Sequence, residues 1–180
     1  MQTAETLYQA EQKQVDTDHH TPTAGAMTGH ILSNLHIQQN KLNQARFALK
    51  GDAKVFADGE ITAMYHRERA LFDELNQLML DEGETIPTTT QEFLDYTFLS
   101  EQGQLKFEST ATILFEIVKD CDAQLMFVTR GIALADKESK FALAAFLRQL
   151  DGWLKHQMRQ IQAYLGHSVR EGLDEEDDDE

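Results

Sequence analysis

The feature that most constrains this chain is the spacing of its apolar residues, which recur every three or four positions over four long segments. These segments cover about residues 22–49, 55–82, 105–134 and 139–165. Such a period is that of an amphipathic α-helix. Glycines at positions 51, 83 and 166 follow three of the segments, where helices commonly end. The pattern predicts four helices, each roughly 40 Å long at 1.5 Å per residue.

The second and third segments are separated by a long connection, residues 84–103, whose apolar stretch 91–99 predicts a short crossover helix. The order of pair, crossover and pair is that of a ferritin-like four-helix bundle. We therefore predict an all-α fold with this bundle over residues 22–166. Residues 1–21 are expected to form an N-terminal extension of a short helix and a polar linker, and residues 167–180 a disordered acidic tail.

Helix boundaries and burial can also be predicted. Ser139 is expected to cap the start of the fourth helix. The second segment carries two neighbouring apolar stripes, which indicates that one side packs in its own bundle and the other against a neighbouring subunit. Trp153 is expected to contribute packing only.

Length and composition limit the possible classes. A chain of 180 residues with 41% hydrophobic and 26% charged residues has the size of one domain and enough apolar residues for a core. No run approaches the ~20 apolar residues of a membrane span, and the first residues lack the plan of a secretory signal. One cysteine excludes an internal disulfide framework. We expect a cytoplasmic protein without a membrane partner.

The charge is distributed unevenly. The net charge is −15, and residues 171–180 contribute eight acidic residues and no basic one. The extension carries four acidic residues and one cation, Lys13. Acidic surfaces repel phosphate, so composition alone argues against nucleic acid as a partner.

Nucleophilic catalysis receives no support. Cys121 lies on the apolar stripe of the third helix, which predicts a buried and inert thiol. No phosphate-binding glycine loop is present. No histidine of the bundle has an acidic residue three positions earlier, so the Glu-x-x-His pairs of an intrasubunit di-iron centre are absent. Glu68 falls on the core stripe, where it is expected to pair with an arginine or to face a subunit contact.

A separate metal site is conceivable where the extension meets the bundle. Asp16, Asp18, His19 and His20 are clustered, and His30 lies about two turns into the first long helix. Carboxylate and imidazole donors suit zinc, manganese or iron. A linker that folds back would bring Asp16, His19 and His30 together; the alternative is a solvated linker that binds nothing.

Three short stretches resemble the Dps family, the ferritin-like DNA-binding proteins from starved cells. Residues 47–51 (Phe-Ala-Leu-Lys-Gly) stand where the family has Trp-x-x-x-Gly. Gly83 with residues 88–93 is similar to the family's turn and crossover entry, and residues 163–166 to its closing Ala-x-Leu-Gly. The resemblance implies a hollow dodecamer that binds iron and often binds DNA through its N-terminal extensions.

The family's iron-oxidising centre lies between two subunits and uses two His, two Asp and one Glu. Counting from Gly51 without gaps, the resemblance places Arg46, Asp58, Thr62, Asp73 and Gln77 at these positions. Only Asp73 is retained, and Asp58 substitutes an oxygen donor for a histidine. A cation at position 46 opposes bound iron, so we expect the standard centre to be missing or rebuilt.

The resemblance implies a shell that protects DNA from oxidative damage by sequestering iron and by binding DNA, with Lys13 as the cation of the extension. Such a protein would be associated with the nucleoid. The alternatives are an active ferroxidase that uses substitute ligands without binding DNA, a DNA-compacting protein without an iron role, and a helical scaffold dimer. The acidic tail could line the cavity or cover a basic patch of the body.

Overall fold

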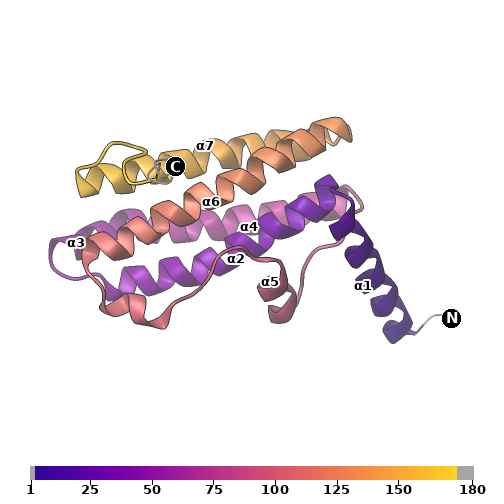
Figure 1. Cartoon of the computed structure of the whole chain (residues 1–180), viewed down its shortest axis with the longest axis horizontal. Coiled ribbons are helices and arrows are strands. Elements are labelled where there is room, and N and C mark those ends of the chain that lie inside the picture. Colours follow the sequence, from indigo (N-terminus) through magenta and orange to yellow (C-terminus); the bar gives the residue numbers. More distant parts are fainter. Residues whose placement is uncertain (1–2, 174–180) are drawn as a thin grey trace, which may run out of the picture.

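The computed structural model describes residues 3–173, without the side chains of residues 18–20. It is built from helices (Figure 1), and the described part contains no strand. In chain order the elements are α1 (Ala4–His20), α2 (Ala24–Ala48), α3 (Asp52–Phe56), the π-helix η1 (Ala57–Ile61), α4 (Thr62–Asp81), α5 (Thr90–Tyr96), the 3₁₀ helix η2 (Gly103–Phe107), α6 (Thr110–Lys137) and α7 (Phe141–Leu165).

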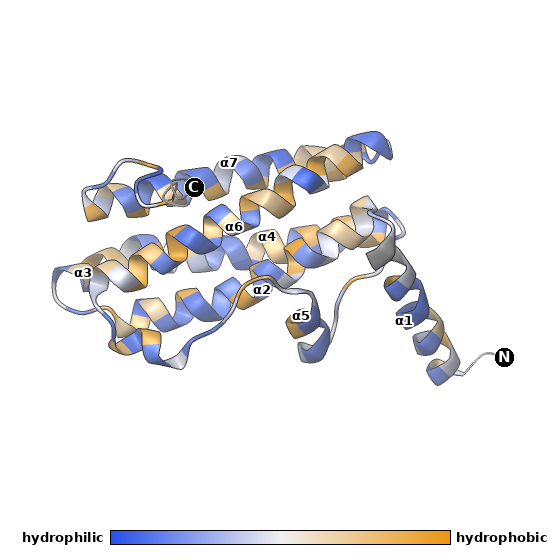
Figure 2. Cartoon of the chain, in the orientation of Figure 1, coloured by the Kyte–Doolittle hydropathy of each residue, from blue (hydrophilic) through white to orange (hydrophobic). Residues whose placement is uncertain are grey.

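The bundle consists of α2, of α4 with its leading turns α3 and η1, of α6 and of α7. Within the bundle, α6 packs against α7, and α2 packs against both α4 and α6. Apolar residues recur along each of these helices (Figure 2), as the sequence period requires. The largest fully buried side chains include Leu35, Leu42, Leu75, Leu114 and Leu147. The predicted ferritin-like four-helix bundle is confirmed.

The crossover between α4 and α6 also follows the prediction. Its short helix α5 packs on α2, and Thr89 begins it with a capping box to Glu92. Beyond α5, the Asn34 side-chain oxygen of α2 accepts hydrogen bonds from the Phe98 amide (2.7 Å) and the Thr97 hydroxyl (3.0 Å). These bonds fasten the connection to the bundle.

Two predicted helix starts are wrong. The third helix begins at Thr110, with Ser109 as its cap, because residues 103–107 form a separate 3₁₀ turn that leaves Phe107 exposed. Ser139 does not cap α7. It has φ +59°, and its amide and that of Lys140 bond back to Asp136 and Ala135. Ser139 therefore closes α6 in the left-handed conformation that follows many helices.

The two ends of the chain differ from expectation as well. α1 continues as one helix to His20, through the stretch expected to be a polar linker, and it leaves the bundle at the end opposite α3 (Figure 1). Residues 167–173, expected to be disordered, form turns held by Gln162, whose side chain donates to the Glu171 carbonyl (2.9 Å). The rest of the predicted acidic tail, 174–180, lies outside the described residues.

Among the described residues, no helix has the length and apolar content needed to cross a membrane.

Candidate functional site

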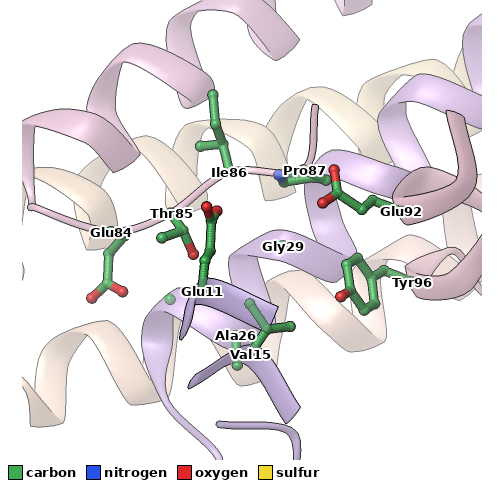
Figure 3. A pocket seen from close by; sticks show the side chains of 11 residues that line it. Glu11, Val15, Ala26, Gly29, Glu84, Thr85, Ile86, Pro87, Glu92 and Tyr96 are labelled. Carbon is green, nitrogen blue, oxygen red and sulfur yellow. The ribbon is translucent and has the colours of Figure 1, made fainter. Parts of the chain in front are cut away.

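The N-terminal joint is a cavity formed where α1 meets the bundle. α1 supplies Glu11 and Val15, and α2 supplies Gly25, Ala26 and Gly29. The connection after α4 and the helix α5 close the other side, with residues 84–87, Glu92 and Tyr96 (Figure 3). Counting its open mouth, the cavity has about 530 Å³ of space not filled by protein atoms.

Carboxylates surround this cavity. Figure 3 shows Glu11, from α1, and Glu92, from α5, both lining this cavity. Glu92 accepts from the amides of Thr88 (2.7 Å) and Thr89 (2.9 Å). Burial acts to raise the pKa of Glu92, but these hydrogen bonds outweigh it and the pKa is lowered. A negatively charged Glu92 therefore faces the joint, where the Gln12 side chain of α1 also donates to it (3.3 Å).

The structure brings two of the predicted joint ligands, Asp16 and His30, close to Tyr96. The Nδ1 atom of His30 is 2.7 Å from the Tyr96 carbonyl oxygen, and the two rings meet edge to face. Burial raises the pKa of the Tyr96 hydroxyl, with further contributions from the charges of Glu92, Asp95 and Asp16. Because a carbonyl only accepts, Nδ1 of His30 carries the proton and Nε2 carries the lone pair.

The other predicted joint residues are placed less completely. His19 and His20 end α1, and their side chains lie outside the described set. Lys13 is exposed on α1. Within the described residues, no three side chains of the His, Cys, Asp and Glu types meet in a way that could hold a metal ion.

The positions that the resemblance assigned to an inter-subunit centre lie on α2, η1 and α4. The Arg46 guanidinium carbon is 4.3 Å from the centre of the Tyr65 ring, and its Nε donates to Asn43 (3.1 Å). Asp58 forms an ion pair with Lys54, one turn earlier. Arg46 is thus held in a cation–π contact, and the Asp58 carboxylate already has a cation.

The remaining three positions lie further along the same element. Thr62 donates its hydroxyl to the Ala57 carbonyl (2.9 Å), and Gln77 donates to Asp81 (3.0 Å). Asp73 is exposed on α4, and no described cation lies within ion-pair distance of it. Of the five, Asp73 is the carboxylate most available to a ligand from outside the chain.

A π-helix at this location was not predicted. η1 spans residues 57–61 and joins α3 directly to α4, with no residue between the three elements. π turns accommodate an additional residue and occur frequently at functional sites. The signal in the sequence was weak: Gly59 interrupts the apolar period between Asp58 and Glu60.

The centre of the bundle contains a polar cluster that sequence reasoning found only in part. Glu68 of α4 is fully buried, and neither of its carboxylate oxygens has a hydrogen-bond partner among the described residues. Burial, followed by the charge of Asp120, raises the pKa of Glu68 well above its usual value. The expected arginine partner of Glu68 is wrong: none of the ion pairs among the described residues includes it.

Two helices add to this cluster. Lys41 of α2 and Asp120 of α6 form a buried ion pair of 2.7 Å. Burial raises the pKa of Asp120 to about 6, although Lys41 acts in the opposite direction. Cys121, also on α6, is buried and accepts a weak contact from Gln38 (3.5 Å), and burial raises the pKa of its thiol. The prediction of an inert thiol agrees with this environment, and Trp153 packs against the core as expected.

Comparison with solved structures found close relatives. The chain is 40% identical to the DpsB protein of Lactococcus lactis, with a TM-score of 0.87 over 92% of this chain and 95% of that one. It is 30% identical to the DpsA protein of the same organism, with a TM-score of 0.88 over 94% and 99%. Dps from Listeria monocytogenes shares the fold at 19% identity and a TM-score of 0.80, over 84% and 98%. No family model and no curated protein sequence matched.

Proposed function

Because this chain belongs to the Dps family of ferritin-like proteins, we propose that it forms a dodecameric shell that sequesters iron and associates with DNA. The likeness to DpsB, in sequence and fold over nearly the whole length of both chains, is the observation that carries this proposal. The resemblances noted at residues 47–51, 83–93 and 163–166 support it further.

Assembly is supported by large apolar side chains that the single chain leaves in water. The exposed fraction is 70% for Phe47, 78% for Val55, 82% for Phe107 and 70% for Phe141. Large aromatic side chains are enriched at contacts between proteins. Contacts between identical copies would bury them, and the oligomeric state measured for variants such as Phe107→Ser tests this directly.

The proposed handling of iron is storage rather than rapid oxidation at the family's standard centre. Arg46 and Asp58 are engaged by Tyr65 and Lys54, and Asp73 is the remaining carboxylate of the five positions. Spread carboxylates can still bind ferrous iron as cargo, because hard oxygen donors suit it.

Stopped-flow measurement of ferrous iron oxidation tests this proposal against the rival of an active ferroxidase. We expect Asp73→Ala to leave the initial rate unchanged, as does a control substitution of another exposed carboxylate, Glu74→Gln. A marked fall in the rate for Asp73→Ala alone would favour the ferroxidase and contradict our account.

A second metal position is proposed at the N-terminal joint, with Asp16, His19, His20 and His30 as its ligands. The support is that Asp16 and His30 both neighbour Tyr96, and that the Tyr96 carbonyl orients the His30 ring with Nε2 as the nitrogen able to coordinate. Zinc or iron fits this donor set. Metal analysis of purified protein should show less bound metal for His30→Ala than for a control, His156→Ala; equal contents would refute the site.

Association with DNA is proposed to involve α1. α1 leaves the bundle as a mostly exposed helix (Figure 1), and Lys13 is its cation. One lysine beside four acidic residues contributes little alone, so the contact would depend on its repetition around the shell. Gel shifts with and without residues 1–20 test this at low and moderate salt. Binding that weakens with salt and disappears with the deletion is expected; binding retained after the deletion would refute the role of α1.

A further inference from the structure

A groove between α6 and α7 gathers positive charge on this acidic chain. Two adjoining hollows share Leu125 and Arg170 and form one continuous groove. Its cations come from three places: Arg130 on α6, Lys155 and Arg159 on α7, and Arg170 in the turns after α7. The groove therefore presents a row of cations along two packed helices.

Part of this positive charge has no counter-charge in the described structure. Arg170 lies 3.2 Å from Asp122, and Lys155 lies 2.9 Å from Asp151. Arg130 and Arg159 are exposed, and neither has a carboxylate within ion-pair distance among residues 3–173. Two guanidinium groups are thus in surplus, which suits an anionic occupant.

The chain supplies such an occupant directly beside the groove. Residues 174–180 are seven consecutive acidic residues, and they follow Leu173, three positions after Arg170. Leu173 packs against the core, and Gly172 lies so close to the Phe115 ring that an added Cβ would be 2.8 Å from it. The point from which the acidic run departs is therefore fixed on α6.

The distances allow the acidic run to reach both surplus cations. Seven extended residues span at most roughly 23 Å. Arg130 lies fifteen residues beyond Phe115, the residue on which Gly172 packs, which is ~22 Å along α6 at 1.5 Å per residue, so a nearly extended run reaches it. Arg159 lines the same hollow as Arg170, which stands three positions before Leu173.

We propose that the groove is a docking surface for the chain's own residues 174–180, whose carboxylates pair with Arg130 and Arg159. The occupied groove is closed to other polyanions, including the phosphates of a nucleic acid, until salt or a competitor displaces the acidic run. This inference goes beyond the proposed function, because it requires neither iron nor DNA binding by α1.

Zero-length carbodiimide crosslinking of the full-length protein tests the contact. The reagent joins carboxylates to lysine amines that touch, so peptide mass spectrometry should find Lys155 linked to residues 174–180 of the same chain. The yield should fall about tenfold at ~1 M salt, where the screening length is about 3 Å, and in the R130Q/R159Q variant. An unchanged yield, or a product that links two chains on a denaturing gel, overturns the proposal.

A second experiment separates the acidic run from DNA as occupant. A full-length variant with Asn or Gln at all seven positions 174–180 should bind DNA severalfold more tightly than the wild type. R130Q/R159Q should remove this gain, whereas the matched control K50Q/R69Q, which changes two exposed cations outside the groove, should not. If R130Q/R159Q weakens DNA binding equally with and without the seven carboxylates, the groove binds DNA instead and the proposal fails.

Discussion

Replacement of Glu68 should stabilise this protein. The Glu68 carboxyl group is fully buried between helices, and no donor from residues 3–173 reaches either oxygen. An unsatisfied buried polar group costs about 1–3 kcal/mol, and leucine has a similar volume to glutamate. Glu68→Leu is therefore expected to raise the free energy of unfolding by about 1–3 kcal/mol, which corresponds to a rise in Tm of roughly 2–4 °C per kcal/mol for a chain of this size.

The pH dependence of stability distinguishes removal of the buried carboxyl group from better packing by leucine as the cause of the stabilisation. The folded-state pKa of Glu68 is raised well above the value of 4.5 that applies to the unfolded chain. Above pH 4.5 the unfolded chain releases this proton and the folded chain keeps it, so stability falls as the pH rises toward the folded-state pKa. The slope for one such group is at most about 1.36 kcal/mol per pH unit. Glu68→Gln should remove this slope, and its amide remains unpartnered, so it gains less at low pH than leucine.

Thermal unfolding followed by circular dichroism between pH 5 and pH 8, at constant protein concentration, measures both effects. Glu74→Gln is the matched control, because Glu74 is exposed and pairs with Arg67 at the surface. Particle mass must be checked for each variant, since assembly alters Tm. A lower Tm for Glu68→Leu at every pH, or a wild-type slope retained in Glu68→Gln, would refute the reasoning.

Three further substitutions test the packing and polar contacts. Lys41→Met leaves the Asp120 carboxylate buried without its cation and should cost about 3–5 kcal/mol at pH 8 in chemical unfolding. That loss should shrink at pH 5, below the Asp120 pKa of about 6, where protonation removes the unpaired charge, and an equal loss at both pH values would contradict it. Gly131→Ala gains about 1 kcal/mol of helix propensity, but its Cβ would lie 3.0 Å from Leu147 and 3.1 Å from Ile31, both fully buried, so the net effect should be a loss of up to about 2 kcal/mol, seen as a lower Tm; an unchanged or higher Tm would argue against tight packing there. Thr89→Ala removes the capping box of α5 and should cost about 1 kcal/mol, with faster hydrogen exchange confined to residues 90–96; unchanged exchange would show the cap to be dispensable.

The long helices were predictable because apolar residues that recur every three or four positions indicate a helix whatever its packing partners are. The crossover helix was predictable from an apolar stretch too short for a bundle helix. The errors lie at the helix ends, whose position depends on single residues. Ser109 caps the start of α6, which was expected near Leu105, and Ser139 follows the end of α6 instead of capping α7. Serine is a favoured N-cap residue at both positions, and only the backbone conformation shows that Ser109 caps a helix start whereas Ser139 follows a helix end.

The site was less predictable because its contacts join residues far apart in the sequence. The pair of Lys41 with Asp120 and the approach of His30 to Tyr96 depend on how helices align. Glu68 was recognised as a core position from its stripe, but the absence of a partner within the described structure follows only from tertiary packing. The register from Gly51 to Asp73 also passes through a π-helix that periodicity alone did not indicate.

The mass of the particle in solution tests the central claim most directly. Native mass spectrometry or sedimentation velocity at neutral pH should find a closed assembly of twelve chains of 20.5 kDa each, about 246 kDa, over a wide range of concentration. A protein that remains monomeric or dimeric across that range would contradict the shell, and with it the proposals for iron storage and for DNA association by repeated α1 helices.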